Sequence, residues 1–342
     1  MSRYFRRGLE KLSDQASRPH DELKNILRDD LEEVSNLIKL RMKSEHAPLI
    51  EEIADHLLKA GGKRLRPLLT LASAKICGYQ GYSHIQLAAA VEFIHTATLL
   101  HDDVVDESDR RRGKSSVNIL WDNASSVLVG DYLFARSFQL MTNAGRLDIL
   151  EILSAASAKI AEGEVLQLSS TGDLKTKEET YYKIIRGKTA ALFSASMEVG
   201  ALIADADKEV VESLYRYGDA LGVSFQITDD LLDFDGGSSS LGKNTGDDFK
   251  EQKLTLPIIH ALSNATEAEF QFWQRTIERG EQIDGDFKKA VNILERHSSI
   301  EFTKMKAIEW CTIAKKSLAD LPDQALKTIL LDLADYVVSR AT

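Results

Sequence analysis

Proline is scarce in this chain, with five residues in a sequence of 342, so few segments are prevented from continuing as helices. Alanine, leucine, glutamate and lysine, which favour helices, are abundant. Apolar residues recur with helical spacing in segment after segment, and no stretch shows the alternation of a half-buried strand. The sequence therefore predicts an all-α protein.

We expect one domain over residues 21–342, because no linker, low-complexity tract or repeat longer than a short motif divides this part of the chain. Within it, residues 21–45 have the apolar spacing of one amphipathic helix. Residues 1–20 are predicted to be an N-terminal extension. It is basic but interrupted by acidic residues and has no apolar core, so a frayed or docking terminus is favoured over a transit peptide.

The net charge of −10 argues against a nucleic-acid-binding protein, which would show a basic face. No apolar run is long enough to predict a transmembrane segment. Cys77 and Cys311 lie in separate helical patterns, where core packing is the simplest interpretation. Two cysteines in a chain of this length are typical of a reducing compartment, and we expect a cytoplasmic protein.

The first functional signal follows an apolar run that ends at Leu100 and predicts a helix over residues 84–106. Asp102, Asp103 and Asp106 lie at the end of this helix, with Asp102 and Asp106 about 40° apart on one face. Three carboxylates repel one another there, and the helix dipole already disfavours negative charge at a C-terminus. A cation is therefore expected. Mg²⁺ suits oxygen ligands that leave positions open for phosphate.

A second string of the same spacing, Asp229, Asp230 and Asp233, ends another predicted helix over residues 208–233. One such string arises easily by chance in a chain rich in aspartate, but two in the same apolar context indicate a paired acidic site. Gln226 lies one turn before the second string, on the same side of the helix.

Basic residues suggest that the ligand carries phosphate. Arg111 and Arg112 follow the first motif, and guanidinium groups bind phosphate oxygens in a forked geometry. Lys63 and Arg66 lie in a glycine-rich junction between two predicted helices. A solvated basic loop would explain this junction equally well by itself, and phosphate binding is favoured only because of the acidic motifs.

Two further segments have alternative interpretations. Gly187-Lys188-Thr189 lacks the context of a P-loop, and indicates either an ordinary helix junction or a kinked helix that presents Lys188 and Thr189 inward. The loops after the second motif carry Lys243 and Lys253, and suit a lid over a charged ligand.

The residues before the first motif suggest space for an apolar chain. His95 shares the aspartates' face one or two turns deeper, although a histidine there is more often a satisfied core residue. Ala97 and Thr98 have small side chains just below the aspartates. They leave room for something long and apolar.

In this order the residues resemble the trans-type polyprenyl diphosphate synthases, the isoprenyl diphosphate synthase family, over most of residues 48–260. The stretches from His95 to His101 and from Leu241 to Asn244 resemble the bacterial octaprenyl to decaprenyl synthases. The motifs that carry the family resemblance are Gly62-Lys63-x-x-Arg66-Pro67, His95, the first aspartate motif with Arg111-Arg112-Gly113, Gly187-Lys188-Thr189, Gln226-x-x-Asp229-Asp230-x-x-Asp233, Gly242-Lys243 and Gln252-Lys253-x-Thr255-x-Pro257.

The resemblance implies an isoprenoid synthase fold, an antiparallel helical bundle around a deep central cavity, and a homodimer. It implies about three Mg²⁺ ions per active site, two on Asp102 and Asp106 and one on Asp229 with Asp233 nearby. The implied contacts to the allylic diphosphate are Arg111, Lys188, Gln226, Lys243 and Lys253, and those to isopentenyl diphosphate are Lys63, Arg66, His95 and Arg112. Asp103, Thr189 and Asp230 complete the predicted catalytic set.

The implied reaction is the repeated condensation of isopentenyl diphosphate onto an allylic diphosphate. The product would be a long all-trans polyprenyl diphosphate, octaprenyl to decaprenyl, delivered to a membrane for quinone side chains. Ala97 in place of a large aromatic residue favours a long product. Two alternatives stay open: a farnesyl or geranylgeranyl diphosphate synthase whose tunnel is closed by Phe134 or Phe138, and an inactive partner subunit of a hetero-oligomeric synthase.

Overall fold

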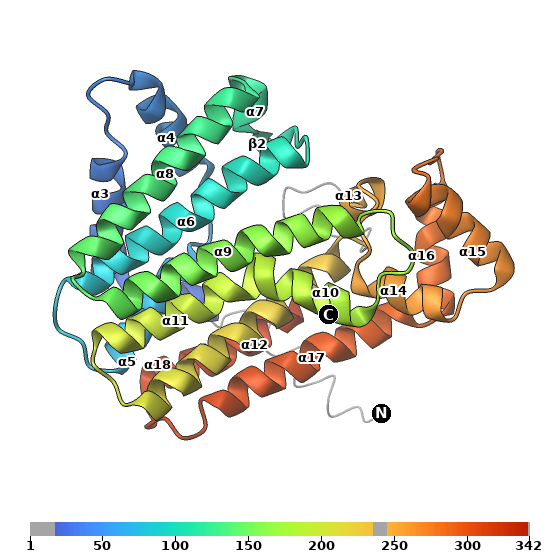
Figure 1. Cartoon of the computed structure of the whole chain (residues 1–342). Coiled ribbons are helices and arrows are strands. Elements are labelled where there is room, and N and C mark those ends of the chain that lie inside the picture. The colour runs from blue at the N-terminus through green and yellow to red at the C-terminus, as the bar shows by residue number, and fades with distance from the viewer. Residues whose placement is uncertain (1–17, 112, 235–244, 341–342) are drawn as a thin grey trace.

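The computed structural model describes residues 18–111, 113–234 and 245–340, and nearly all of its elements are helices (Figure 1). The predictions for Arg112, for Lys243 and for most of the N-terminal extension fall outside these residues. The division into an extension and one domain stays a prediction, and the first described helix begins at Pro19. No helix in the described part of the chain has the length and apolar character needed to traverse a bilayer.

Helix α6 (Ser83–Val105) is packed between neighbours on several sides. A run of fully buried alanines in its first half, Ala88 to Ala90, allows other helices to approach its backbone. It lies against α8 (Asn123–Asn143) and α5 (Leu65–Ile76), and ends in the first aspartate motif.

Helix α11 (Ala191–Ile203) is buried on almost every side, as expected for a helix without a polar face. It packs on α5, on α9 (Leu147–Ser170) and on α12 (Lys208–Leu232), and α12 in turn packs on α17 (Ser299–Ser317). Neighbouring long helices run in alternating directions, so the C-terminal ends of α6 and α12 lie at the same end of the bundle (Figure 1).

The shorter elements surround this bundle, and the last of them, α18, packs on α12 and α17. In chain order they are α2 (Pro19–Ile26), α3 (Arg28–Arg41), α4 (Pro48–Ala60), β1 (Arg110–Arg111), β2 (Lys114–Ser115), α7 (Val117–Leu120), α10 (Glu178–Ile185), η1 (Arg186–Ala190), α13 (Asp247–Lys250), α14 (Leu256–Ser263), α15 (Glu267–Trp273), η3 (Gln274–Glu278), α16 (Asp286–Arg296) and α18 (Ala325–Ser339); η1 and η3 are π-helical.

The all-α prediction is confirmed, with two local differences. The single helix predicted over residues 21–45 is wrong: α2 and α3 are separated at Leu27, whose backbone leaves helical geometry at φ −104° and ψ 21°. Because the chain bends there, α2 packs on α18 and α3 on α6. The second difference is an antiparallel hairpin of two-residue strands, β1 and β2, directly after the first aspartate motif.

Candidate active site

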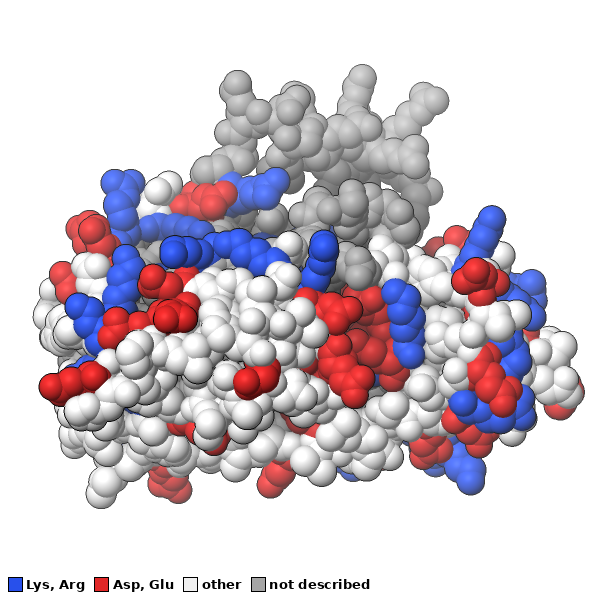
Figure 2. Space-filling view, turned by 90° about the horizontal axis from the view of Figure 1, so that it is seen from above, with Lys and Arg blue, Asp and Glu red and all other residues white. Residues whose placement is uncertain are grey.

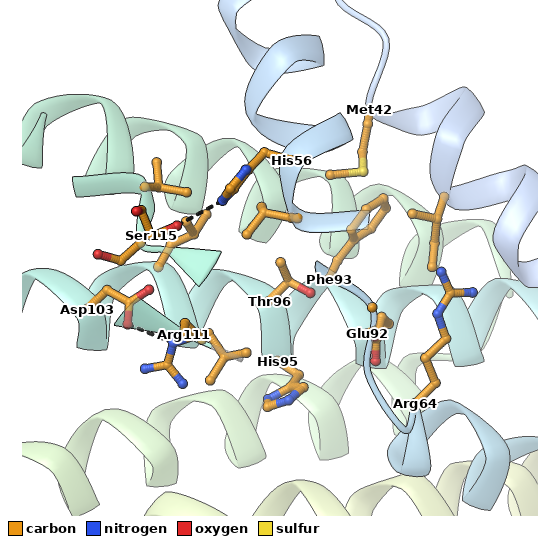
Figure 3. Close-up of a pocket in the computed structure, with 17 residues that line it drawn as sticks. Met42, His56, Arg64, Glu92, Phe93, His95, Thr96, Asp103, Arg111 and Ser115 are labelled. Carbon is orange, nitrogen blue, oxygen red and sulfur yellow. Dashed lines mark hydrogen bonds and ion pairs between the residues drawn. The ribbon is translucent and has the colours of Figure 1, made fainter. Parts of the chain in front are cut away.

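The three aspartates of the first motif point in different directions. Asp102 and Asp106 lie one turn apart at the end of α6, while Asp103 is 2% exposed and faces the β1–β2 hairpin. There the Arg111 Nε atom donates to Asp103 Oδ1 at 2.6 Å (Figure 3). Asp103 therefore holds the hairpin, and leaves Asp102 and Asp106 for a ligand.

The second motif is divided in the same way. Asp229 forms an ion pair with Arg340, with 3.0 Å between Asp229 Oδ1 and Arg340 Nη2. Asp230 is 4% exposed, and its carboxylate accepts hydrogen bonds from buried side chains. Asp233 accepts from the backbone N–H groups of Asp247 and Asp248 at 3.2 and 3.1 Å, and so fixes the start of α13.

Lys253 brings the two motifs together. Its Nζ atom lies 3.2 Å from Asp106 Oδ2 and also pairs with Glu251, while Asp248, five residues earlier, is bonded to Asp233. Burial lowers the pKa of Lys253, but the carboxylates of Asp106, Asp248 and Glu251 outweigh it and hold the pKa well above the ordinary value. We call Asp102, Asp106, Asp229 and Asp233 the acidic site. Figure 2 shows acidic side chains gathered on this side of the bundle, with Lys and Arg on either side.

Lys188 approaches the acidic site from the π-helical segment η1, so the kinked helix is the correct interpretation of this segment. Its Nζ atom lies 3.2 Å from Glu164 Oε1, and both charges act on Asp102. The backbones of α9 and η1 lie very close together at this point. A Cβ atom added to Gly163 of α9 would lie only 2.6 Å from the backbone nitrogen of Lys188. Glycine at 163 is what permits this approach.

Thr189, next along η1, faces α12. Its hydroxyl donates to Gln226 Oε1 at 2.6 Å, and the Gln226 Nε2 atom donates to Asp230 Oδ1 at 2.8 Å. Thr189 and Gln226 are therefore joined through their side-chain oxygens, and Thr189 is buried, as the inward interpretation of η1 predicts.

Lys63, Arg66 and His95 form a second group, which we call the basic cluster. Arg66 Nη1 lies 3.2 Å from His95 Nε2, and because a guanidinium only donates, that ring nitrogen is the acceptor. The Arg66 guanidinium also stacks over Phe193 at 4.6 Å. Burial lowers the pKa of Lys63, and the nearby Arg340 lowers it further. Positive charge is thus concentrated beside the acidic site.

Ala97 is fully buried in α6, and the Thr98 hydroxyl donates to the His95 carbonyl at 2.8 Å. The cavity drawn in Figure 3 lies on another face of α6, between that helix and α4, and is lined by Thr96, Asp103 and Arg111 among others. On the α8 side, Phe134 stacks on His101 with ring centroids 6.1 Å apart.

Several charged or polar residues of the site were not predicted from the sequence. Glu164, Tyr181, Asp248 and Arg340 each contact or electrostatically perturb a predicted residue. Arg340 lies 111 positions after its partner Asp229. No spacing rule joins residues so far apart, and only packing of α18 on α12 brings them together.

Negative charge at the acidic site is incompletely balanced. Burial, with Glu164 nearby, raises the pKa of Asp102 to about 7, and burial with Asp248 raises the pKa of Asp233 to about 7. Asp102 and Asp106 lie one turn apart at the end of α6, and Mg²⁺ takes one or two such carboxylates and completes its octahedron with phosphate oxygens and water. Within the described residues no group of three histidine, cysteine, aspartate or glutamate side chains that could hold a metal ion is found. The residues present therefore fit metal ions that bind together with a diphosphate.

A model of the family described as Polyprenyl synthetase matches residues 47–294. The chain belongs to the polyprenyl synthetase family. It is 40% identical over 320 residues to an octaprenyl diphosphate synthase of Escherichia coli (strain K12), covering 94% of this chain and 98% of that protein. The predicted family resemblance is confirmed, and the chain is a trans-prenyltransferase.

Solved structures of the family have the same fold. A decaprenyl diphosphate synthase from Rhodobacter capsulatus superposes with a TM-score of 0.92 at 59% identity, covering 94% of this chain and 99% of that one. A polyprenyl synthase from Caulobacter crescentus CB15, complexed with calcium and isoprenyl diphosphate, gives a TM-score of 0.91 at 46% identity, covering 96% and 100%. The roles of individual site residues stay predictions.

We expect the ligand-free protein to lose stability as pH rises through the window from about 4 to about 7. An unfolded aspartate has a pKa of about 3.9, whereas Asp102 and Asp233 in the fold have pKa values of about 7. The folded state retains protons that the unfolded chain has released, so its stability falls until both groups are ionised. Replacing Asp102 by Asn should remove the part of this stability loss that comes from ionisation of Asp102. The gain in unfolding free energy should be larger at pH 8 than at pH 5, by on the order of 2 kcal/mol.

Urea unfolding of wild type and Asp102→Asn at the two pH values measures this difference. Asp284→Asn, at an exposed position, is the control and should change neither value. An equal gain at pH 5 and pH 8 for Asp102→Asn would contradict the raised pKa.

Proposed function

We propose that this prenyltransferase is Mg²⁺-dependent and makes a long-chain all-trans polyprenyl diphosphate, octaprenyl to decaprenyl, from isopentenyl diphosphate and an allylic diphosphate. The observation that carries the proposal is that one short segment links the two aspartate motifs. Lys253 pairs with Asp106 of the first motif, and Asp248, five residues before it, donates its backbone N–H to Asp233 of the second. The Escherichia coli and Rhodobacter capsulatus relatives support the product class. The calcium and isoprenyl diphosphate of the Caulobacter crescentus structure support the ligands.

The allylic diphosphate would bind at the acidic site. Asp102 and Asp106 would hold two Mg²⁺ ions, and Asp229 with Asp233 a third. Bound Mg²⁺ supplies positive charge where the leaving diphosphate becomes more negative. The residues that we assign to the oxygens of the allylic substrate are Arg111, Lys188, Gln226, Lys243 and Lys253.

Isopentenyl diphosphate would bind at the basic cluster. Arg66 contacts His95, and Lys63, three residues before Arg66, lies close enough to Asp229 of the acidic site to feel its charge. Arg112 would join them. Because both substrates are then held in adjacent sites, orientation supplies much of the rate.

The reaction breaks the allylic C–O bond, and the electron pair leaves with the diphosphate. The allylic cation is stabilised by the oxygens of Thr189 and Gln226, which face each other at 2.6 Å. The double bond of isopentenyl diphosphate then forms the new C–C bond. The proton that is lost passes to the released diphosphate, so the step requires no side-chain base.

We expect Asp106→Asn to reduce turnover by at least about 100-fold, because an amide oxygen binds a divalent ion far less well than a carboxylate. The purified chain alone is incubated with labelled isopentenyl diphosphate and an allylic primer over a series of Mg²⁺ concentrations. Asp284→Asn serves as the matched control. If the wild-type chain incorporates no label by itself, the partner-subunit alternative is favoured instead.

Product length depends on what lies below the acidic site. Ala97, fully buried in α6, offers no aromatic floor at this point. Phe138 is 42% exposed on α8, which argues against it as the floor of a tunnel inside this chain. Phe134 is the remaining candidate for the short-chain alternative, since it packs on His101.

We expect Ala97→Phe to shorten the product, because the added ring would occupy the path of the growing chain. Chromatographic sizing of the products measures the change. Thr96→Phe adds the same ring on the face of α6 that lines the cavity of Figure 3, and should leave the length unchanged. Under the short-chain alternative Phe134→Ala would lengthen the product and Ala97→Phe would not alter it.

We further propose that two copies of the chain associate through α7 and α8. These helices lie at the outer edge of the bundle (Figure 1), and Ile119, Leu120, Val127, Leu128 and Phe138 are between 38% and 66% exposed on them. Large apolar side chains gathered on one surface are typical of an interface. A second copy, as the family resemblance implies, would bury them.

Leu128→Glu should convert the dimer to a monomer, because each interface would bury two new carboxylates. Sedimentation equilibrium measures the mass in solution. Leu147→Glu changes an equally apolar side chain, 82% exposed at the start of α9, and should leave the dimer intact. An unchanged mass for Leu128→Glu would exclude this surface.

We propose the cytoplasm as the location, since Cys77 and Cys311 are both free thiols. The long apolar product would then pass to a membrane and serve as the side chain of a quinone.

A further inference from the structure

Tyr181 on α10 is a buried residue for which the proposed chemistry has no use. It is 2% exposed, and its hydroxyl donates to Asp230 Oδ2 at 2.6 Å. Burial and the Asp230 carboxylate raise the pKa of Tyr181 well above its ordinary value, so the hydroxyl stays protonated and remains a donor. Tyr181 therefore supplies a permanent hydrogen bond to the central aspartate of the second motif.

That aspartate in turn orients Gln226. When Asp230 is ionised, its carboxylate can only accept and the amide NH₂ group can only donate, so the 2.8 Å contact between Asp230 Oδ1 and Gln226 Nε2 fixes which way the amide points. The amide oxygen is then directed at Thr189, whose hydroxyl donates to it at 2.6 Å. Four side chains from α10, η1 and α12 thus form one chain of hydrogen bonds that converges on Asp230, with Gln226 and Tyr181 each donating to one of its carboxylate oxygens.

The part of this chain that runs from Asp230 through Gln226 to Thr189 matters for a cation. Negative charge on Asp230 polarises the Gln226 amide, and the amide oxygen polarises the Thr189 hydroxyl, so the Gln226–Asp230 bond strengthens the Thr189–Gln226 bond. The result is two oxygens, on Gln226 and Thr189, whose lone pairs are held in place before the substrate arrives. Preorganised oxygens of this kind stabilise a developing positive charge without reorganisation.

Without Tyr181 the buried carboxylate would lose the donor to its second oxygen. An unsatisfied buried acceptor is costly, and the cost is relieved by rotation towards another donor or cation. Such a rotation of the Asp230 carboxylate would release the Gln226 amide.

We propose that Tyr181 is a positioning residue for the condensation, acting through Asp230 to hold Gln226 and Thr189 at the allylic cation. This inference rests on the proposed function. Tyr181 does not touch the substrate; its hydroxyl determines where the two oxygens that do so are held.

The test is Tyr181→Phe, which removes one hydroxyl and keeps the ring. Turnover should fall on the order of tenfold, while the KM values for both substrates change less than about twofold. The misplaced oxygens should also admit water, which captures the cation, loses a proton and gives a prenyl alcohol. The ratio of alcohol to condensation product, measured with labelled allylic diphosphate, should therefore rise. Partial unfolding does not alter this ratio, because folded molecules make both products.

A double-mutant cycle separates positioning from a general structural effect. In a Thr189→Val background, Tyr181→Phe should cost much less turnover than in wild type, because the chain of hydrogen bonds is already broken. Tyr182→Phe is the matched control: Tyr182 is the next residue, half-buried against Trp310, and its loss of a hydroxyl should change neither turnover nor the product ratio.

Unchanged turnover and product ratio in Tyr181→Phe would overturn the inference, as would equal costs in the two backgrounds. Both results require that wild type makes a polyprenyl product. If wild type makes none, the proposed function itself fails and the inference fails with it.

Discussion

The structure depends on holding negative charge at the C-terminal ends of two helices, α6 and α12, that lie at the same end of the bundle. The dipoles of α6 and α12 disfavour this charge, and burial raises the pKa of Asp102 and Asp233 further. The arrangement persists because each motif has one aspartate paired with a cation. Lys253 pairs with Asp106 in the first motif, and Arg340 pairs with Asp229 in the second. Stability is given up at this point of the fold, and the same excess of negative charge is what attracts divalent ions and, through them, a diphosphate.

Each aspartate motif separates into two kinds of residue because successive side chains on a helix point about 100° apart. The outer positions face the acidic site. The central positions, Asp103 and Asp230, turn into the protein, where they hold Arg111 and Gln226. The central aspartates thus position other side chains, whereas the metal-binding roles predicted from the sequence fall on the four outer aspartates.

Much of the fold could be predicted because helical periodicity is a local property. The helix predicted over residues 84–106 is found as Ser83–Val105, and that over 208–233 as Lys208–Leu232. The break at Leu27 was not predictable in this way, since Leu27 continues the apolar pattern and is itself buried. The break accompanies the packing of α2 on α18 and of α3 on α6, contacts between segments far apart in the sequence.

The sequence by itself determined the helical class, the two acidic strings and the family, because each is written in the order and spacing of residues. Only the tertiary structure decided which cations balance these carboxylates. Glu164 reaches Lys188 and Tyr181 reaches Asp230 from other helices, across 24 and 49 positions of the chain. Such contacts depend on how closely the helices pack. Gly163, for example, lets α9 approach the backbone of η1, and no local sequence pattern encodes the distance between two helices.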